Sequence, residues 1–177
     1  MSARRVLSAE AAQALLLERA RRVSSPRGLE TPHEPVALFR RGGQLFGIAL
    51  AHLRFTWSAR TLVEVPRAPK FIVGAIPGDG SLVTVIDLIH LYDIPMGGVL
   101  DLPFVLVAEL AGRRIGIACE KVLGAQPLSV DSFKPAARSY GAVERTARWR
   151  SESVQVVEVP LLLQDARLNP TRAGRSR

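Results

Sequence analysis

The side chains that could support catalysis or metal binding are few and scattered along this chain. His33, His52 and His90 stand far apart in dissimilar contexts, and no His, Cys, Asp or Glu pair has the spacing of metal ligands. The single cysteine, Cys119, lies in an apolar segment and is interpreted as a small core residue. A Cys119–His90 nucleophile pair would need a third group to orient the base, and the sequence points to none. The pattern predicts no catalytic, metal or cofactor site.

The apolar stretch from Phe71 to Leu91 holds two further polar features. Pro77-Gly78-Asp79-Gly80 superficially suggests a phosphate-binding turn, but it matches neither G-x-G-x-x-G nor the P-loop, and a strand is expected after it. Asp87 stands between Ile86 and Leu88. Because a buried carboxylate is costly without partners, we expect Asp87 to accept backbone or hydroxyl hydrogen bonds that lock a turn. His90, which follows the strand, is assigned a structural role.

Composition indicates a globular domain in a reducing compartment. The chain has 177 residues, a 47% hydrophobic fraction and one cysteine, so we expect a cytoplasmic protein of one domain or two small ones. The apolar runs are shorter than the roughly 20 residues of a membrane span. The charged N-terminus lacks the pattern of a secretory signal.

The net charge of +8 is divided evenly along the sequence. Residues 1–34 carry +2, residues 35–140 carry +3 and residues 141–177 carry +3, and aromatic residues make up only 6%. A dedicated nucleic-acid binder more often concentrates its charge in one stripe with interleaved aromatic residues. Nucleic acid is therefore an unlikely partner, and a basic small-barrel nucleic-acid-binding protein is kept as the alternative hypothesis.

Hairpins and turns dominate the predicted secondary structure. Residues 36–41 and 44–50 form a hairpin around Gly42-Gly43, and residues 104–110 and 113–119 form another around Ala111-Gly112. Residues 71–91 read as strand, glycine turn and a long buried strand over 82–91. Apolar residues at helical spacing predict an amphipathic helix from Ser8 to Val23.

The second half of the chain repeats the first. Gly47-Ile48-Ala49 recurs as Gly116-Ile117-Ala118, 69 positions later, and Ile86-Asp87-Leu88 recurs as Val157-Glu158-Val159, 71 positions later. Such a repeat implies two copies of one β unit. We expect two curled sheets of about five strands each, which close and remove their edges. The second copy lacks glycine over residues 144–151, where we expect a looser polar loop.

Three stretches resemble the CheW-like adaptor domain of bacterial chemosensory systems. They are FRRGGQLFGIAL, FIVGAIPGDGSLVTVIDL and VLVAELAGRRIGIACEKVLG, and the resemblance covers roughly residues 35–165. Residues 1–34 then form an N-terminal helix and connector, residues 35–168 the CheW-like domain, and residues 169–177 a disordered basic tail. The resemblance implies a mainly β fold of two interlocked five-stranded β-barrel subdomains preceded by an N-terminal α-helix.

The resemblance also implies a scaffold without enzyme activity, cofactor or small-molecule substrate. Its partners would be the tip of a methyl-accepting chemoreceptor and the regulatory domain of a CheA-type histidine kinase, and it would reach the membrane only through receptors. The contact candidates are apolar side chains together with the two residues that shape the turn. They are Phe46, Ile48, Leu50, Leu53, Phe55 and Val83, with Asp79 and Gly80 at the turn.

Two positions depart from the family pattern. Asp79 stands where the family usually has an arginine before the turn glycine. Leu53-Arg54-Phe55 replaces the common Val-x-Glu pattern, so an aromatic ring stands in place of the acid. Charge reversal at an interface can cost several kcal/mol, so we expect these changes to weaken binding to ordinary receptors. A further hypothesis is a structural remnant that pairs with its own kind through exposed strands.

Overall fold

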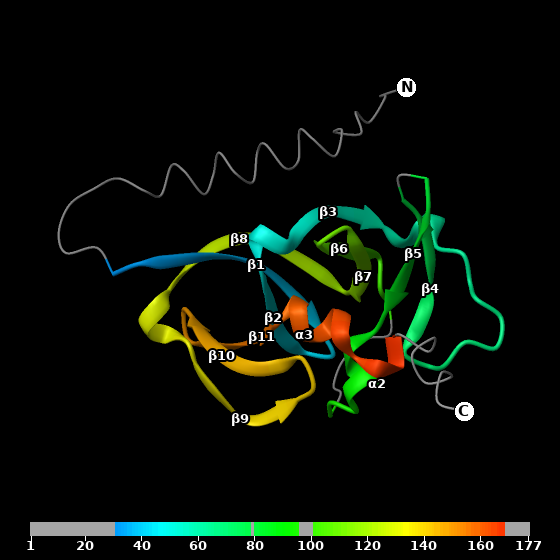
Figure 1. Cartoon of the computed structure of the whole chain (residues 1–177). Helices are drawn as coiled ribbons and strands as arrows, with labels where there is room; N and C mark the ends of the chain where they lie inside the picture. Colours follow the sequence, from blue (N-terminus) through cyan, green and yellow to red (C-terminus); the bar gives the residue numbers. More distant parts are fainter. Residues whose placement is uncertain (1–30, 79, 96–100, 169–177) are drawn as a thin grey trace, which may run out of the picture.

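Most described residues of this chain, in a computed structural model, lie in β-strands (Figure 1). The structure describes residues 31–78, 80–95 and 101–168. The predicted helix at 8–23, Asp79 and the predicted disordered tail at 169–177 lie outside these residues. The strands are β1 (His33–Arg41), β2 (Gln44–Ala49), β3 (Leu53–Ser58), β4 (Ile72–Pro77), β5 (Leu82–Ile86), β6 (Phe104–Leu110), β7 (Arg113–Cys119), β8 (Lys121–Ser129), β9 (Lys134–Tyr140), β10 (Val143–Trp149) and β11 (Glu152–Val157).

The strands form two mixed sheets that exchange hairpins. The first sheet has the order β8-β1-β2-β11-β10-β9, and the second has the order β3-β6-β7-β5-β4. The β1–β2 hairpin thus pairs with β8 and β11 from the second half of the chain, whereas the β6–β7 hairpin pairs with β3 and β5 from the first half. Both predicted hairpins are confirmed, and their exchange interlocks the two halves (Figure 1).

The sheets differ from the predicted pair of closed five-stranded barrels. The first sheet has six strands, and within the described residues no strand pairing joins its edges β8 and β9 or the edges β3 and β4 of the second sheet. In the second half, β9 pairs with β10, whereas the equivalent place in the first half has only an isolated bridge between Val63 and Ala75. Pro66 and Pro69 follow that bridge, and proline has no N–H group with which to extend a ladder.

The two repeated glycines lie in equivalent surroundings. Gly47 pairs with Val156 across parallel strands, and Gly116 pairs with Val85 in the same way. A Cβ atom at Gly47 would lie 2.6 Å from Val36, and one at Gly116 would lie 2.8 Å from Val105, which is the residue 69 positions after Val36. Both glycines are therefore required where neighbouring side chains cover the strand closely, and the repeat is one of structure as well as of sequence.

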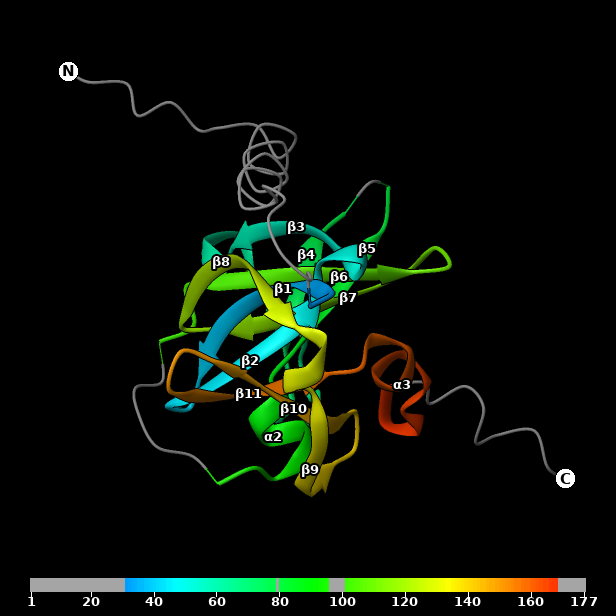
Figure 2. The same ribbon diagram turned by 90° about the vertical axis from the view of Figure 1, so that its left-hand side faces the viewer.

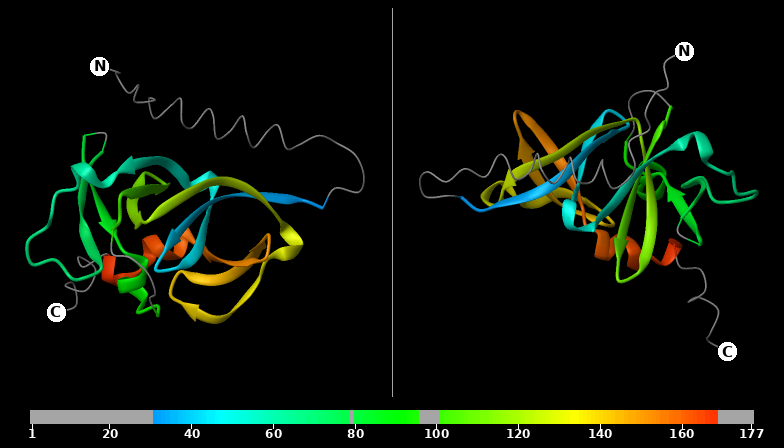
Figure 3. Two further views of the ribbon diagram at one scale, coloured as in Figure 1. Left: turned by 180° about the vertical axis from the view of Figure 1, so that it is seen from behind. Right: turned by 90° about the horizontal axis from the view of Figure 1, so that it is seen from above.

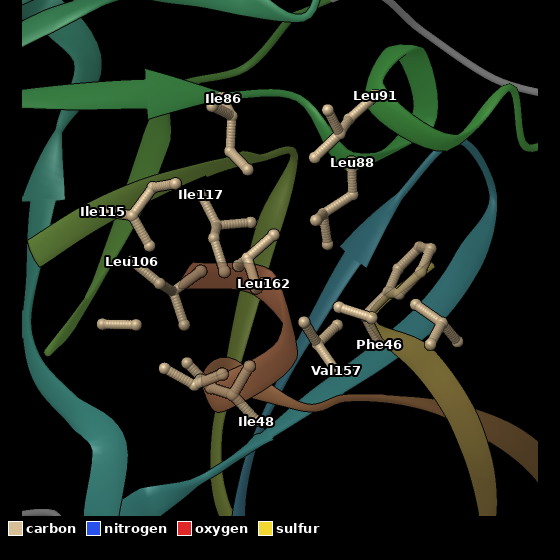
Figure 4. Close-up of a cluster of buried hydrophobic side chains, with 14 of the residues drawn as sticks. Phe46, Ile48, Ile86, Leu88, Leu91, Leu106, Ile115, Ile117, Val157 and Leu162 are labelled. Carbon is tan, nitrogen blue, oxygen red and sulfur yellow. The ribbon is translucent and has the colours of Figure 1, made fainter. Parts of the chain in front are cut away.

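Three apolar clusters form the core. One fills the space between the sheets and contains the side chains labelled in Figure 4, among them Phe46, Ile86 and Leu106. The other two lie within the individual sheets, around Leu38 and Val154 in the first and around Val83 and Val105 in the second. The central cluster fixes the position of one sheet relative to the other.

Short helices follow the last strand of each half. The predicted strand over 82–91 ends at Ile86, and α2 (Leu88–Tyr92) follows because the Asp87 side chain accepts a hydrogen bond from the Ile89 N–H and caps the helix. In the second half, α3 (Val159–Gln164) follows β11. Neither of these helices is long and apolar enough to cross a membrane, and the same holds throughout the described part of the chain.

The predicted polar loop over 144–151 is largely a strand. Residues 143–149 form β10, which pairs with β9 on one side and β11 on the other, and only Arg150 and Ser151 make the turn. The local sequence offers just Val143 and Ala147 as buried side chains on this strand. Pairing on both sides therefore overrides a weak local preference for strand.

Gly141 should tolerate alanine less well than Gly112. Both have left-handed backbone angles, with φ of 55° and 74°, but a Cβ atom at Gly141 would lie 2.1 Å from the Tyr92 ring, whereas one at Gly112 meets nothing within 4 Å. We expect Gly112→Ala to lower the free energy of unfolding by about 1 kcal/mol and Gly141→Ala by about 3 kcal/mol. Urea denaturation of both variants measures the difference, and equal losses would contradict the contact with Tyr92.

Candidate functional site

A buried ion pair lies at the junction of the two sheets. Arg41, the last residue of β1, donates from Nε to Asp87 Oδ1 at 3.0 Å and from Nη2 to Asp87 Oδ2 at 2.6 Å. The two side chains are 1% and 2% exposed. This two-pronged geometry is the strongest form of the arginine–carboxylate interaction, and it ties the first sheet to the end of β5 in the second.

Further groups complete this buried network. Arg41 Nη1 donates to Glu120 Oε1 at 3.1 Å, and the same oxygen accepts from the Gly42 N–H at 2.7 Å. His90 Nδ1 lies 2.5 Å from Asp87 Oδ2. Glu120 stands between β7 and β8, so the network connects segments from both halves of the chain.

The pairing shifts the ionisation of both partners in opposite directions. Burial alone would raise the pKa of Asp87, but hydrogen bonds from Arg41 and His90, together with the Arg41 charge, outweigh burial and hold this pKa below its usual range. The hydrogen bond to Asp87 raises the pKa of Arg41 against the effect of burial. Both groups are therefore charged at neutral pH, and the pair acts as a structural connection.

Neither the cysteine nor the potential metal ligands show a reactive arrangement among the described residues. Cys119 is fully buried, and burial raises the pKa of its thiol to about 12, so the thiolate is absent at neutral pH. This agrees with the prediction of a core cysteine. Over the described ranges, no group of three or more His, Cys, Asp or Glu side chains is placed to hold a metal ion.

The predicted contact residues fall into two groups. Phe46, Ile48 and Val83 are fully buried in the core, so a partner could reach them only if the core opened. Leu50, Leu53 and Phe55 are half-buried, and Gly80 is exposed with a φ of 75° in the turn between β4 and β5. The apolar pattern could not separate these groups, because both faces of several strands pack against something.

The exposed apolar side chains were not among the predicted contacts. Leu82 is 73% exposed at the start of β5, and Val63 is 61% exposed beside β4. Leu82 pairs with Pro77 immediately after the exposed turn, which protrudes from the second sheet in Figure 2. Only Ser81 separates Leu82 from Gly80, so the turn itself was the signal that could have drawn attention to Leu82.

An edge strand lies on the other side of the second sheet. Among the described strands β3 pairs with β6 alone, and its residues alternate between half-buried and exposed from Leu53 to Ser58. Phe55 and Trp57 face inward, with ring centroids 5.7 Å apart, and pack against the core of the second sheet. Arg54, on the outer face, lies 3.8 Å from Glu109. With respect to the described strands, this edge therefore combines unpaired backbone groups with an apolar margin.

Comparisons with known proteins agree with this architecture. The model of the CheW-like domain family matches residues 35–167. The crystal structure of the scaffolding protein TtCheW from Thermoanaerobacter tengcongensis is similar in fold, with a TM-score of 0.62 and 20% sequence identity over 71% of this chain and 88% of that chain. Direct sequence comparison with curated proteins gives no significant match.

Removal of Arg41 should destabilise the fold far more than removal of its neighbour. Arg41→Met leaves Asp87 buried without its cation, which we expect to cost about 3–5 kcal/mol of unfolding free energy. Arg40 pairs with Glu152 at 2.7 Å at the surface, so Arg40→Met should cost about 1 kcal/mol or less. Denaturation measures the unfolding free energy of both variants. Similar losses would show that the buried pair contributes no more to stability than the surface pair.

Acid should weaken the fold through Asp87. Because its pKa is lowered in the folded state, the pair contributes stability above the unfolded pKa of about 3.9, and this contribution is lost as the pH falls through the folded value. We expect the stability advantage of the parent chain over Asp87→Asn to be constant near neutral pH and to shrink below about pH 4. Denaturation series at several pH values measure the difference, and an advantage independent of pH would contradict this account.

Proposed function

The chain belongs to the CheW-like domain family, and we propose that it is a non-enzymatic adaptor that couples chemoreceptors to a CheA-type histidine kinase. It would act in the cytoplasm and reach the membrane only through the receptors. The observation that carries this proposal is the exposed apolar turn region of the second sheet, with Leu82 73% exposed beside Gly80. An isolated large apolar side chain at a protruding turn is suited to anchor a protein partner.

We assign the turn region to the kinase. The regulatory domain of the kinase is expected to be a related β fold, which can meet the β4–β5 hairpin end to end. Val63 lies beside β4 through its bridge to Ala75 and is a second exposed apolar side chain of this sheet.

We assign the β3 edge to the receptor tip. Leu50, in the turn before β3, and Leu53 are half-buried against the central core, so they leave an apolar margin for a helical partner. Phe55 stands where the family commonly has an acid, and Arg54 is exposed beside it. A receptor that fits this edge would therefore present an apolar or acidic side chain rather than a basic one.

Binding measurements on two variants of exposed residues test the assignment of the turn region to the kinase. Leu82→Glu should leave stability unchanged but weaken binding to the kinase regulatory domain from the same genome by about tenfold or more. Val130→Glu is the control. Val130 is 43% exposed and lies between β8 and β9 of the first sheet, away from the β4–β5 turn. Titration calorimetry with the purified kinase domain, and with a receptor-tip peptide, measures both variants.

Three results are decisive for this experiment. Loss of kinase binding in Leu82→Glu alone supports the assignment. Equal losses in both variants would place the contact elsewhere. Absence of binding by the parent chain to both partners would contradict the adaptor role itself.

A further inference from the structure

The positive charge of the domain is concentrated on one hairpin. Residues 31–168 carry 15 basic and 13 acidic residues, a net charge of +2. Residues 133–151, which cover β9, β10 and their flanking turns, carry five basic residues and one acidic residue, a net charge of +4. The rest of the domain is therefore net negative. The even distribution seen along the sequence conceals a local basic surface, because the chain termini carry the remaining positive charge.

Arginines on this hairpin are held against aromatic rings. The Arg150 guanidinium lies 4.5 Å from the Trp149 ring centroid, and that of Arg138 lies 5.1 Å from the Tyr140 centroid. Both arginines, and Arg148 between them in sequence, are exposed. Within the described residues no carboxylate forms an ion pair with these three arginines, whereas Arg145 is paired with Glu158 at 2.5 Å. Stacking on a ring limits the motion of a guanidinium and leaves its N–H edges directed outward.

A groove with a mixed polar and apolar lining lies beside the hairpin. Its volume is about 380 Å³, and its lining includes Gln44, Tyr140, Ser153 and Gln155. Arg148 is the cross-strand partner of Ser153, so it stands next to a residue that lines the groove. The groove also contains Glu152, whose carboxylate is already held by Arg40 through two hydrogen bonds of 2.7 and 2.8 Å.

We propose that the β9–β10 hairpin and the groove beside it bind a carboxylate-rich segment of a partner protein. Stacked guanidinium groups offer paired N–H donors that match carboxylates, and amide and hydroxyl groups along the groove can bond to an extended backbone. This surface goes beyond the proposed coupling role. It lies at the opposite end of the molecule from the β4–β5 turn in the views of Figures 1 and 3, so both surfaces can be occupied together.

The packing of the aromatic rings favours an acidic protein segment over single-stranded nucleic acid. Sequence-tolerant binding of nucleic acid depends on aromatic faces that are open to stacked bases. Here Trp149 and Phe133 pack against the core of the first sheet, and Tyr140 packs against the central core. Arg150, Arg145 and Arg138 cover these three rings in turn. The rings therefore position cations and are not available as platforms for bases.

Fluorescence anisotropy with the full chain tests the proposal. The probe is a labelled oligo-glutamate peptide at low ionic strength, compared with labelled oligo-thymidine of similar charge. The variant Arg138→Gln/Arg148→Gln/Arg150→Gln should bind the peptide about tenfold more weakly than the parent. The control Arg60→Gln/Arg67→Gln/Lys70→Gln removes the same charge from exposed residues elsewhere and should stay within about twofold of the parent.

Every outcome decides the matter. Weaker binding of the peptide by the hairpin variant alone, with thermal unfolding unchanged, supports the site. Equal losses in the two variants would show a diffuse charge effect and overturn it. Tighter binding of oligo-thymidine than of the peptide would identify the surface as a nucleic-acid site instead, and no binding of the peptide by the parent chain would remove the proposal. None of these results depends on whether the chain binds a kinase.

Discussion

The ion pair between Arg41 and Asp87 is the constraint on which the arrangement of the two sheets depends. Each charge has been taken out of water, and each is tolerable only because the other is present within hydrogen-bond distance. The pair therefore permits one relative placement of β1 and β5 and disfavours the alternatives. Burial of the apolar cluster between the sheets favours folding, but apolar contacts alone would accept several packings.

The two halves share a plan but not the chemistry of their connections. Leu110 occupies the position 69 residues after Arg41, so β6 ends in an apolar side chain where β1 ends in a cation. Glu158 corresponds to Asp87 and pairs with Arg145, but these side chains are 25% and 41% exposed. The first copy thus holds a buried charge and the second a half-exposed one. Duplication has preserved the backbone, while the side chains at equivalent positions have taken different environments.

Sequence reasoning recovered the features that local patterns encode. The glycine turns at 42–43 and 111–112 marked both hairpins, and the recurrence of Gly-Ile-Ala marked the repeat. It overestimated the strand that follows Gly80, because the apolar run continues past Asp87 and only the cap at Ile89 reveals the change to helix. It also gave no separate strands to β8 and β9, whose residues are half-buried or exposed along most of their length.

The candidate site was harder to predict, because exposure depends on which segments meet in space. Val83 and Leu82 are neighbours with similar side chains, yet one is fully buried and the other is the most exposed large apolar residue described. The cations around Trp149 and Tyr140 were not singled out, because residues 144–151 were predicted to be a loop and are instead mostly a strand paired with β9. The partner of Asp87 was missed for the same reason, because Arg41 lies 46 positions away.

The exchange of hairpins has a consequence for how the polypeptide can acquire its form. The first sheet needs β10 and β11, so it stays incomplete until nearly the whole domain has left the ribosome. Contacts between segments so distant in sequence favour slow, cooperative assembly over stepwise growth. For the same reason a fragment ending between β5 and β6 would lack the central strands of the second sheet, and the gene could not be split there into two autonomous modules.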